Sequence, residues 1–423
     1  MTKRLYYDSS EIYEFDTVVE DVAPASTEPS RPAVILRETA FYPTSGGQVH
    51  DTGWLTLDGA EPLRVTEVAD AEDGRVVHYL EAPAKLPLAG AAVHGSIDFE
   101  RRRDHMQQHS GQHVLSAAFV ELYQMPTVSF HMGEDYCSID LATPSVSSAQ
   151  IEGAERRANQ VVFENRRVRI RYVSRAEAEK LGLRKVPPAE RDELRLVEVA
   201  DFDVSACGGT HVSSSGQIGA IVLRKSERVR QGTRVEFVCG ERAVRMARRD
   251  YSALSDAAAL FSAQLWDVPE QIRKSIEESK LLRRQKDGAL DELAELMALA
   301  ALQSQPETSG RKMVVRAFSD RDINFAKLFA QKVTRAGTPA IALVASTVDP
   351  AGLVFAQTPV QISGGAPGSS GSVADMGALL KQVLSSVGGR GGGSRDFAQG
   401  GVPAGSTVNV EQLLREAAGT IGG

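Results

Sequence analysis

The chain has 423 residues, a formal net charge of -7, 42% hydrophobic and 24% charged residues, and three cysteines. This length predicts about two to three domains of a soluble globular protein. So few cysteines exclude a disulfide framework and favour a reducing, cytoplasmic location. No apolar run approaches the roughly 20 residues of a membrane-spanning helix, and the N-terminus lacks the apolar core of a signal peptide, so we expect neither a membrane protein nor a secreted one.

The acidic net charge does not by itself indicate nucleic-acid binding. Arginines nevertheless cluster locally, at 101–103, 166–171, 248–249 and 283–284. Each cluster alone is most simply a solvated face, but basic patches on an acidic protein can still bind phosphates.

Residues 1–95 are expected to form a small β-barrel. Short runs rich in valine, isoleucine and leucine, separated by glycine, proline and aspartate turns, predict closely spaced strands at 33–36, 64–68, 76–79 and 93–99. Between the first two runs, Gly46 and Gly47 permit unusual backbone angles and close approach, while Thr39 and Gln48 could line a pocket. From this segment alone, an ordinary hairpin loop is the simpler interpretation.

Residues 96–240 are expected to form an α+β domain around a histidine pair. His109 and His113 lie within the run 104–119, whose apolar residues recur at helical spacing. On a helix, positions four apart share one face, so both imidazoles can reach one ion. Further helices are predicted at 149–163 and 176–181, strands at 168–173 and 194–199, and a hairpin of 218–225 with 234–239 around Gln231 and Gly232.

A second pair of possible ligands lies far downstream. Cys207 and His211 enclose two glycines, which let the backbone turn sharply, so that the pair can converge without a helix. Together with the first pair they make three imidazoles and one thiolate, a tetrahedral set suited to zinc. Cys137 and Cys239 lie in apolar or strand-like surroundings and are interpreted as small buried hydrophobic residues.

Residues 241–305 are predicted to be helical, with a break and a new helix start at 267–269, where a proline occurs. Apolar residues follow an interrupted spacing of three and four. This pattern indicates a helical hairpin or an imperfect coiled coil, used as a spacer or as a dimer contact.

Residues 306–423 are expected to form a separate α/β domain, with strands at 313–318, 340–345 and 353–357 and helices at 322–335, 375–386 and 410–418. A glycine-rich run spans 388–401. No Gly-Lys-Ser/Thr follows it, so it is not a Walker loop and ATP binding is not expected. It could be a flexible linker, or its amides could cradle a phosphate backbone together with Arg390 and Arg395.

Taken jointly, these motifs resemble the alanyl-tRNA editing proteins (the AlaX family, in their long form) and the editing and C-terminal parts of alanyl-tRNA synthetase. The resemblance rests on the glycine-rich motif at 39–53, HSGQH at 109–113, TVSFHMG at 127–133, SID at 138–140, CGGTH at 207–211 and the glycine run at 388–401, which is similar to a DHH-associated tRNA-binding domain. Ser45 is a departure, because many members carry a third glycine there.

The resemblance implies a trans-editing hydrolase that deacylates mischarged tRNA(Ala), chiefly Ser-tRNA(Ala) and also Gly-tRNA(Ala), with zinc held by His109, His113, Cys207 and His211. The resemblance also implies catalytic roles for Thr39, which would select serine, and for Gln108, which with His131 would contact the acceptor end. Substrate or RNA binding is implied for Gly46, Gly47 and Gln48, with the two glycines holding the barrel loop against the zinc domain, and phosphate contacts for Arg390 and Arg395. The chain begins directly with the barrel, so charging of tRNA is not expected.

The role of zinc stays open at this stage. Four protein ligands describe a closed, structural site, whereas a catalytic zinc keeps an open position, so either one ligand exchanges or zinc mainly positions the substrate. A non-catalytic tRNA-binding module with structural zinc is the alternative, and a zinc hydrolase of another ester or amide is a third. A homodimer through the helical linker or the C-terminal domain is also a possibility.

Overall fold

The computed structural model describes residues 1–23, 31–81, 86–181, 183, 193–230, 232–359, 374–403, 405 and 408–422. The chain divides into two compact units, Met1–Ala257 and Ala258–Gly423. The predicted domains at 1–95 and 96–240 both lie in the first unit, and the predicted helical segment 241–305 is shared between the two. Among the described residues, no helix combines the length and apolar character needed to cross a membrane.

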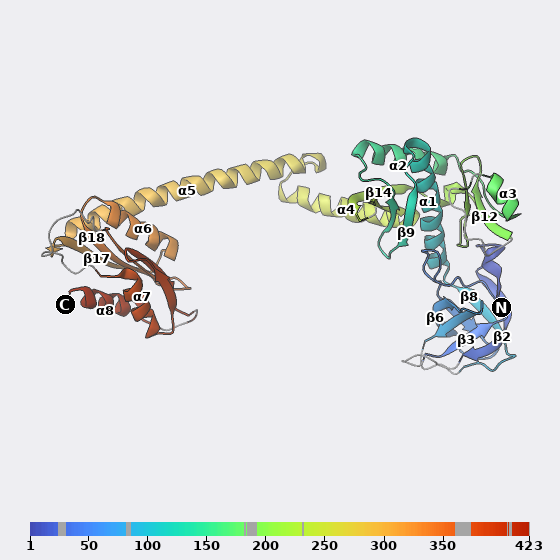
Figure 1. Cartoon of the computed structure of the whole chain (residues 1–423), viewed down its shortest axis with the longest axis horizontal. Coiled ribbons are helices and arrows are strands. Elements are labelled where there is room, and N and C mark those ends of the chain that lie inside the picture. Colours follow the sequence, from blue (N-terminus) through green and yellow to red (C-terminus); the bar gives the residue numbers. More distant parts are fainter. Residues whose placement is uncertain are drawn as a thin grey trace. The chain divides into compact units, whose positions relative to one another are not determined.

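The first unit begins with a closed six-stranded barrel (Figure 1). Around the barrel the strands follow the order β2 (Glu14–Ala23), β3 (Ala33–Leu36), β7 (Val76–Leu80), β6 (Leu63–Asp70), β5 (Gly53–Thr56) and β8 (Ala92–Ile97). The four predicted strands are confirmed, except that the last one ends at Ile97, where Asp98 precedes the next helix. β2 and β5 were not predicted. β2 is rich in acidic residues, which are depleted in strands, and β5 is only four residues long.

A long central helix, α1 (Phe99–Tyr123), organises the rest of this unit (Figure 1). It packs against α2 (Ser148–Phe163) and against a four-stranded antiparallel sheet in the order β14 (Ile221–Val229), β15 (Gly232–Cys239), β10 (Cys137–Leu141), β9 (Thr127–Met132). Gly111 allows this close packing, since a Cβ there would lie 2.2 Å from the sulfur of Cys239. Both Cys137 and Cys239 are fully buried, as predicted.

A smaller antiparallel sheet, β11 (Val168–Ser174), β12 (Glu193–Val199) and β13 (Asp203–Ala206), completes the unit with α3 (Arg175–Lys180). The predicted helices and the β11, β12, β14 and β15 strands are confirmed, although Gln231 of the predicted hairpin lies outside the described residues. β9, β10 and β13 were not predicted. Their polar and apolar residues alternate over only four to six positions, which is a weak signal.

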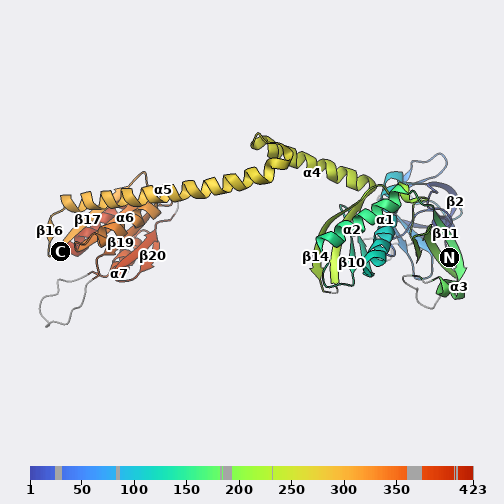
Figure 2. The same cartoon turned by 90° about the horizontal axis from the view of Figure 1, so that it is seen from above.

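The second unit contains a six-stranded sheet with helices on both faces (Figure 2). Its strand order is β16 (Glu307–Thr308), β17 (Arg311–Phe318), β18 (Ala340–Ser346), β19 (Gly352–Gln357), β21 (Phe397–Gly401), β20 (Arg390–Gly393). One core joins the sheet to α5 (Val268–Ser304) and α6 (Ile323–Arg335), and the other joins it to α7 (Met376–Ser385) and α8 (Val410–Gly422). The predicted strands and helices of this region are confirmed.

The glycine run at 388–401 is not a flexible linker, contrary to one of the two interpretations of the sequence. It contains the whole of the paired strands β20 and β21. Gly391 lies opposite Gly400, and a Cβ on either residue would approach both the opposite Cα, at 2.6–2.7 Å, and a methyl group of Leu384 on α7, at 2.3–2.8 Å. The glycines therefore let α7 pack directly on this hairpin.

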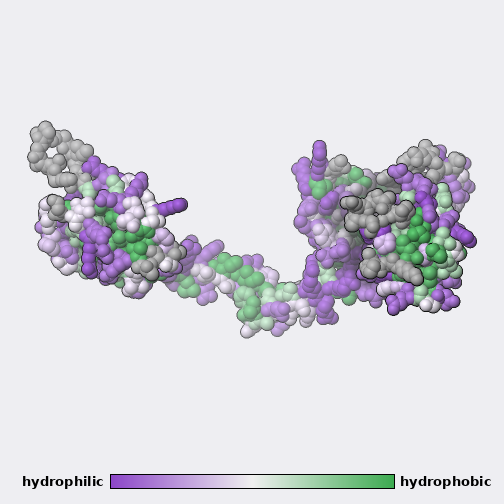
Figure 3. Space-filling view, turned by 90° about the horizontal axis from the view of Figure 1, so that it is seen from below, coloured by the Kyte–Doolittle hydropathy of each residue, from purple (hydrophilic) through white to green (hydrophobic). Residues whose placement is uncertain are grey.

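The helical region consists of α4 (Gly240–Leu260) and α5, with Pro269 in the first turn of α5 as predicted. The C-terminal part of α5, including Ala294, Ala298 and Leu302, is buried in the second unit. Large apolar side chains remain exposed elsewhere along α4, α5 and the short 3-10 turn between them, Leu265–Asp267 (Figure 3). Among them are Leu260, Trp266, Ile272, Ile276, Leu281 and Leu282. A homodimer through this region stays a prediction.

Candidate metal centre

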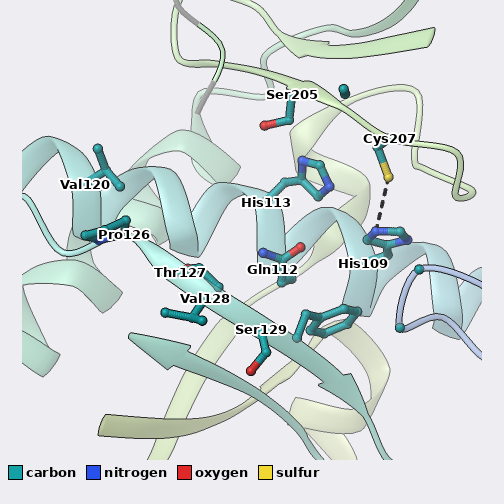
Figure 4. Close-up of a pocket in the computed structure, with 14 residues that line it drawn as sticks. His109, Gln112, His113, Val120, Pro126, Thr127, Val128, Ser129, Ser205 and Cys207 are labelled. Carbon is teal, nitrogen blue, oxygen red and sulfur yellow. Dashed lines mark hydrogen bonds between the residues drawn. The ribbon is translucent and has the colours of Figure 1, made fainter. Parts of the chain in front are cut away.

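The structure brings the four predicted ligands together. One ligand atom from each of His109, His113, Cys207 and His211 lies within 4.8 Å of all the others. Nε2 of His109 is 3.4 Å and Nε2 of His211 is 3.3 Å from the sulfur of Cys207. Figure 4 shows His109 and His113 on successive turns of α1, facing Cys207. Three imidazoles and a thiolate so arranged can hold a borderline-soft cation such as zinc.

His109 is oriented by the barrel. Its Nδ1 lies 2.8 Å from Oε1 of Gln48, which also accepts a hydrogen bond from the backbone of Thr210, and the Gln48 amide donates to the Thr210 hydroxyl. Because Oε1 can only accept, Nδ1 carries the proton and Nε2 is free for a metal. Gln48, predicted to line the pocket, is instead fully buried behind His109, a candidate metal ligand.

The other two histidines have similar partners. Nδ1 of His211 lies 3.1 Å from the hydroxyl of Ser110 on α1. Nδ1 of His113 lies 3.5 Å from the carboxylate of Asp203, which also accepts a hydrogen bond from Ser205. All three Nε2 atoms are thereby left for one centre, the usual arrangement around a protein-bound metal.

The protonation tendencies of Cys207 and His211 suit a metal, whereas that of His113 opposes one. Burial raises the pKa of the Cys207 thiol, but the imidazoles of His109 and His211 outweigh it and hold that pKa well below its usual range. Burial lowers the pKa of His211 to about 3. Burial also lowers the pKa of His113, but hydrogen bonds with Asp203 and Cys207 outweigh it and raise the value to about 9. A metal must displace the His113 proton, so its affinity should rise with pH up to about 9.

The turn that carries Cys207 and His211 is held from behind. The guanidinium of Arg195 on β12 donates to the carbonyls of Cys207, at 2.6 Å, and Gly209, at 3.1 Å. Gly209 is required by space, because a Cβ there would lie 2.2 Å from the ring of His109. Gly209 thus serves close packing against α1, whereas a Cβ on Gly208 would meet only Tyr7, at 3.8 Å.

A cavity of about 290 Å³ opens beside the cluster. It is lined from the barrel loop by Gly46 and Gly47, from α1 by His109, Gln112, His113 and Val120, from the β9 segment by residues 126–130, and from the end of β13 by Ser205, Ala206 and Cys207 (Figure 4). Three of the four candidate ligands therefore face the cavity, and His211 lies behind them.

Two residues expected to act in catalysis do not line this cavity. Thr39 is fully buried, and its hydroxyl lies 2.8 Å from Nε2 of His78 and accepts a hydrogen bond from the backbone of Phe41. The side chain of Gln108 is also fully buried, and exchanges two hydrogen bonds with the backbone of Cys239 at the end of β15. The immediate contacts of both side chains are structural.

Gly46 and Gly47 lie on the cavity wall. Both have positive φ values, 58° and 86°, which favour glycine. A Cβ on Gly47 would lie 2.9 Å from the backbone oxygen of Phe130 on β9. The glycine pair therefore brings the barrel loop against the strand that forms the opposite wall.

His131 is exposed on β9, outside the cavity lining. Its Nε2 lies 3.3 Å from the Ser129 hydroxyl and 3.5 Å from the Asp140 carboxylate. One nitrogen facing both groups cannot relay a proton between them as in a Ser-His-Asp triad. Asp140 is instead paired with Arg234, whose hydrogen bonds lower the pKa of the carboxyl to about 2.

Arg390 and Arg395 belong to the second unit. Arg390 opens β20 and its side chain is exposed, and Arg395 follows that strand, with its carbonyl accepting hydrogen bonds from Gln357 and Met376. Both guanidinium groups are accessible to an anionic ligand.

Sequence reasoning gave no role to several residues of the site: Gln112 and Thr127, which lie in motifs it quoted, and Ser116, Asp203 and Arg195, which do not. Gln112 could have been found, because it lies inside the histidine motif and one helical turn beyond Gln108, on the same face. Asp203 and Arg195 carry no local signal, since their partners are distant in the sequence or are backbone groups.

Comparison with known proteins gives concordant matches. Residues 194–235 match the family model "Threonyl and Alanyl tRNA synthetase second additional domain", and residues 2–101 match "tRNA synthetases class II (A)". The alanyl-tRNA editing protein AlaX-L of Pyrococcus horikoshii is 30% identical over 96% of this chain and 95% of its own length. A solved C-Ala domain of Aquifex aeolicus alanyl-tRNA synthetase covers 28% of this chain at 17% identity, with a TM-score of 0.22, too low to define a shared fold.

Alanine–tRNA ligases are similar over part of their length. The enzyme of Pyrococcus furiosus is 36% identical over 73% of this chain and 33% of its own length. The enzyme of Thermococcus kodakarensis is 30% identical over 98% of this chain and 43% of its own length. The chain therefore spans less than half of these ligases.

Proposed function

Because the chain belongs to the alanyl-tRNA editing proteins, we propose that it is a hydrolase that deacylates mischarged tRNA(Ala), chiefly Ser-tRNA(Ala) and also Gly-tRNA(Ala). The observation that carries this proposal is the cavity with three candidate metal ligands on its wall. A separate hydrolytic site is useful for this substrate, because an apolar pocket for alanine rejects a smaller residue or an added hydroxyl only weakly.

We propose that His109, His113, Cys207 and His211 hold zinc. The donor set and the buried partners of the imidazoles fit this ion. When bound, zinc would supply Lewis-acid assistance or a fixed point for the ester and its amino group. The chain itself binds and orients the substrate: the barrel loop and β9 enclose it, and hydroxyl and amide groups of the wall bind its polar atoms.

Removing the partner of His109 should weaken metal binding. We expect Gln48→Leu to lower zinc affinity by about 10- to 100-fold, because the imidazole loses the acceptor that fixes its tautomer. Titration against a chromogenic chelator measures this affinity. Gln160→Leu is the matched control, since the Gln160 side chain is exposed on α2 and contacts Glu164. Equal zinc affinity in Gln48→Leu and wild type would exclude an orienting role for Gln48.

Thr39 remains our proposal from the sequence for serine selection. The Thr39 hydroxyl is hydrogen-bonded to His78 and Phe41 and does not line the cavity. In this role it must therefore affect the shape of the cavity indirectly, through the packing of the barrel. Thr39→Val should then lower the ratio of serine to alanine release from the two esters, because valine keeps the shape and loses the hydrogen bonds. An unchanged ratio would exclude Thr39 from selection.

The second unit is proposed to bind the body of the tRNA. Replacing Arg390 and Arg395 together with glutamate should raise the KM for aminoacyl-tRNA and leave kcat unchanged at saturation. Each lost phosphate contact should also reduce the slope of the plot of log binding constant against log salt concentration by about 0.7–0.9 in magnitude. Arg335→Glu, an exposed change on α6, is the control. tRNA affinity equal to that of wild type would argue against this role.

A non-catalytic tRNA-binding module with structural zinc is the alternative. It predicts tight binding of tRNA(Ala) by the zinc-loaded protein without release of any amino acid. A hydrolase of other substrates predicts turnover of small amino-acid esters at rates that do not depend on tRNA. The proposed editing function predicts release of serine from intact Ser-tRNA(Ala) at rates well above those for small esters.

A further inference from the structure

One wall of the cavity contains a continuous chain of hydrogen bonds. The amide Nε2 of Gln112 on α1 lies 2.8 Å from the hydroxyl of Ser116, one turn further along the helix, and that hydroxyl lies 2.6 Å from the hydroxyl of Thr127 on β9. Ser116 is fully buried, whereas Gln112 and Thr127 both line the cavity (Figure 4). The two ends of the chain thus face the substrate, and its middle is hidden.

Such a chain has a direction. The Ser116 hydroxyl has Gln112 and Thr127 as its hydrogen-bond partners among the described residues. If the Gln112 amide donates to Ser116, Thr127 is the acceptor left for the Ser116 proton, so the Thr127 proton is free to donate and Oε1 of Gln112 is free to accept. If the amide is turned round, Thr127 donates to Ser116 and Ser116 donates to Oε1 of Gln112, which leaves the amide protons and a lone pair of Thr127 facing the cavity. In both cases one end offers a donor and the other an acceptor.

The neighbouring group on β9 has a fixed direction as well. The Ser129 hydroxyl donates to the carboxylate of Asp140 at 2.7 Å, and Asp140 is held by Arg234. Ser129 therefore presents an acceptor to the cavity. A protonated amino group can only donate, so it fits Ser129 but cannot satisfy the donor end of the Gln112–Ser116–Thr127 chain.

We propose that Gln112 and Thr127 are specificity-determining residues that bind one hydroxyl group of the substrate, which donates to the accepting end of this chain and accepts from the donating end. The inference rests on the proposed function. Two hydroxyl groups lie near the ester of Ser-tRNA(Ala): the serine side chain and the free hydroxyl of the terminal ribose. Gly-tRNA(Ala) carries only the second.

The test compares deacylation of Ser-tRNA(Ala) and Gly-tRNA(Ala) by wild type, Thr127→Val and Thr127→Ser, with zinc content measured for each. Thr127→Val should lower kcat/KM for at least the serine ester by about 10- to 100-fold at unchanged zinc content, because a buried hydrogen bond to the substrate is lost. Thr127→Ser should restore the rate. Gln112→Leu should reproduce the loss from the other end of the chain, and Thr143→Val, which removes a hydroxyl from the loop after β10, serves as the control.

A loss confined to the serine ester assigns the bound hydroxyl to the serine side chain, and an equal loss on both esters assigns it to the ribose; either result supports the inference. Rates of Thr127→Val equal to wild type on both esters, or a loss that follows loss of zinc, would overturn it and leave the proposed function standing. No deacylation by zinc-loaded wild type would remove the proposed function and the inference with it.

Discussion

Replacing Cys207 with alanine should abolish stoichiometric zinc binding and lower the release of serine from Ser-tRNA(Ala) by about a hundredfold or more. Cys207 contributes the thiolate among the four ligands, and its sulfur lies within 3.4 Å of two of the imidazoles. Without it, only the three imidazoles remain to hold the ion. The turn after β13 then contributes His211 alone. Zinc content by elemental analysis and serine release by filter assay measure the two effects.

Cys137→Ala is the control for loss of a cysteine. Cys137 is fully buried in the sheet, and burial raises the pKa of its thiol to about 12, so it stays protonated and cannot act as a ligand. This variant should keep one zinc per chain. Full zinc content together with full activity in Cys207→Ala would show that the centre is not built as proposed.

The second large effect concerns the contact between the barrel and α1. Arg102 is fully buried and forms an ion pair with the equally buried Asp51, with Nη2 of Arg102 2.5 Å from Oδ2 of Asp51. The guanidinium also donates to the carbonyls of Ser10 and Ala40, and Asp51 accepts from the backbone of Tyr42. This network fixes the barrel loop relative to the helix that carries His109 and His113.

Arg102→Leu should lower the free energy of unfolding of the first unit by about 3–5 kcal/mol, because it leaves the Asp51 carboxylate buried without its partner. Urea denaturation followed by circular dichroism measures the change. The double variant Arg102→Leu with Asp51→Leu should recover part of the loss, since no uncompensated charge then remains. A decrease below about 1 kcal/mol in the single variant would show that water or rearrangement solvates Asp51.

The sequence predicted the features that local patterns encode. Helical spacing located α1, and the pairs His109/His113 and Cys207/His211 are short motifs whose internal geometry follows from a helix and a glycine turn. That the two pairs meet was inferred from residue chemistry, and the structure places them together. The glycine pair at 46 and 47 was found for the same reason, because positive φ is a local property.

Features that depend on distant partners were not predictable. Gln108 was assigned a role and Gln112 was not, although both adjoin a histidine. Only the packing of β15 shows that Gln108 is covered, whereas Gln112 reaches the cavity. Thr39 was placed in the pocket because of its motif, but it is fully buried in the barrel, where its hydroxyl forms a hydrogen bond with His78. The glycine run at 388–401 has the composition of a linker, and only its pairing beneath α7 makes it two strands.

The most direct test of the central claim is the release of serine from Ser-tRNA(Ala) by the zinc-loaded 423-residue chain, with Ala-tRNA(Ala) as the parallel substrate. The proposed function predicts rapid release of serine, and slow release of alanine from the correctly charged tRNA. If the folded, zinc-loaded protein binds tRNA(Ala) and releases neither amino acid, the editing function is contradicted and the chain is a tRNA-binding module with structural zinc.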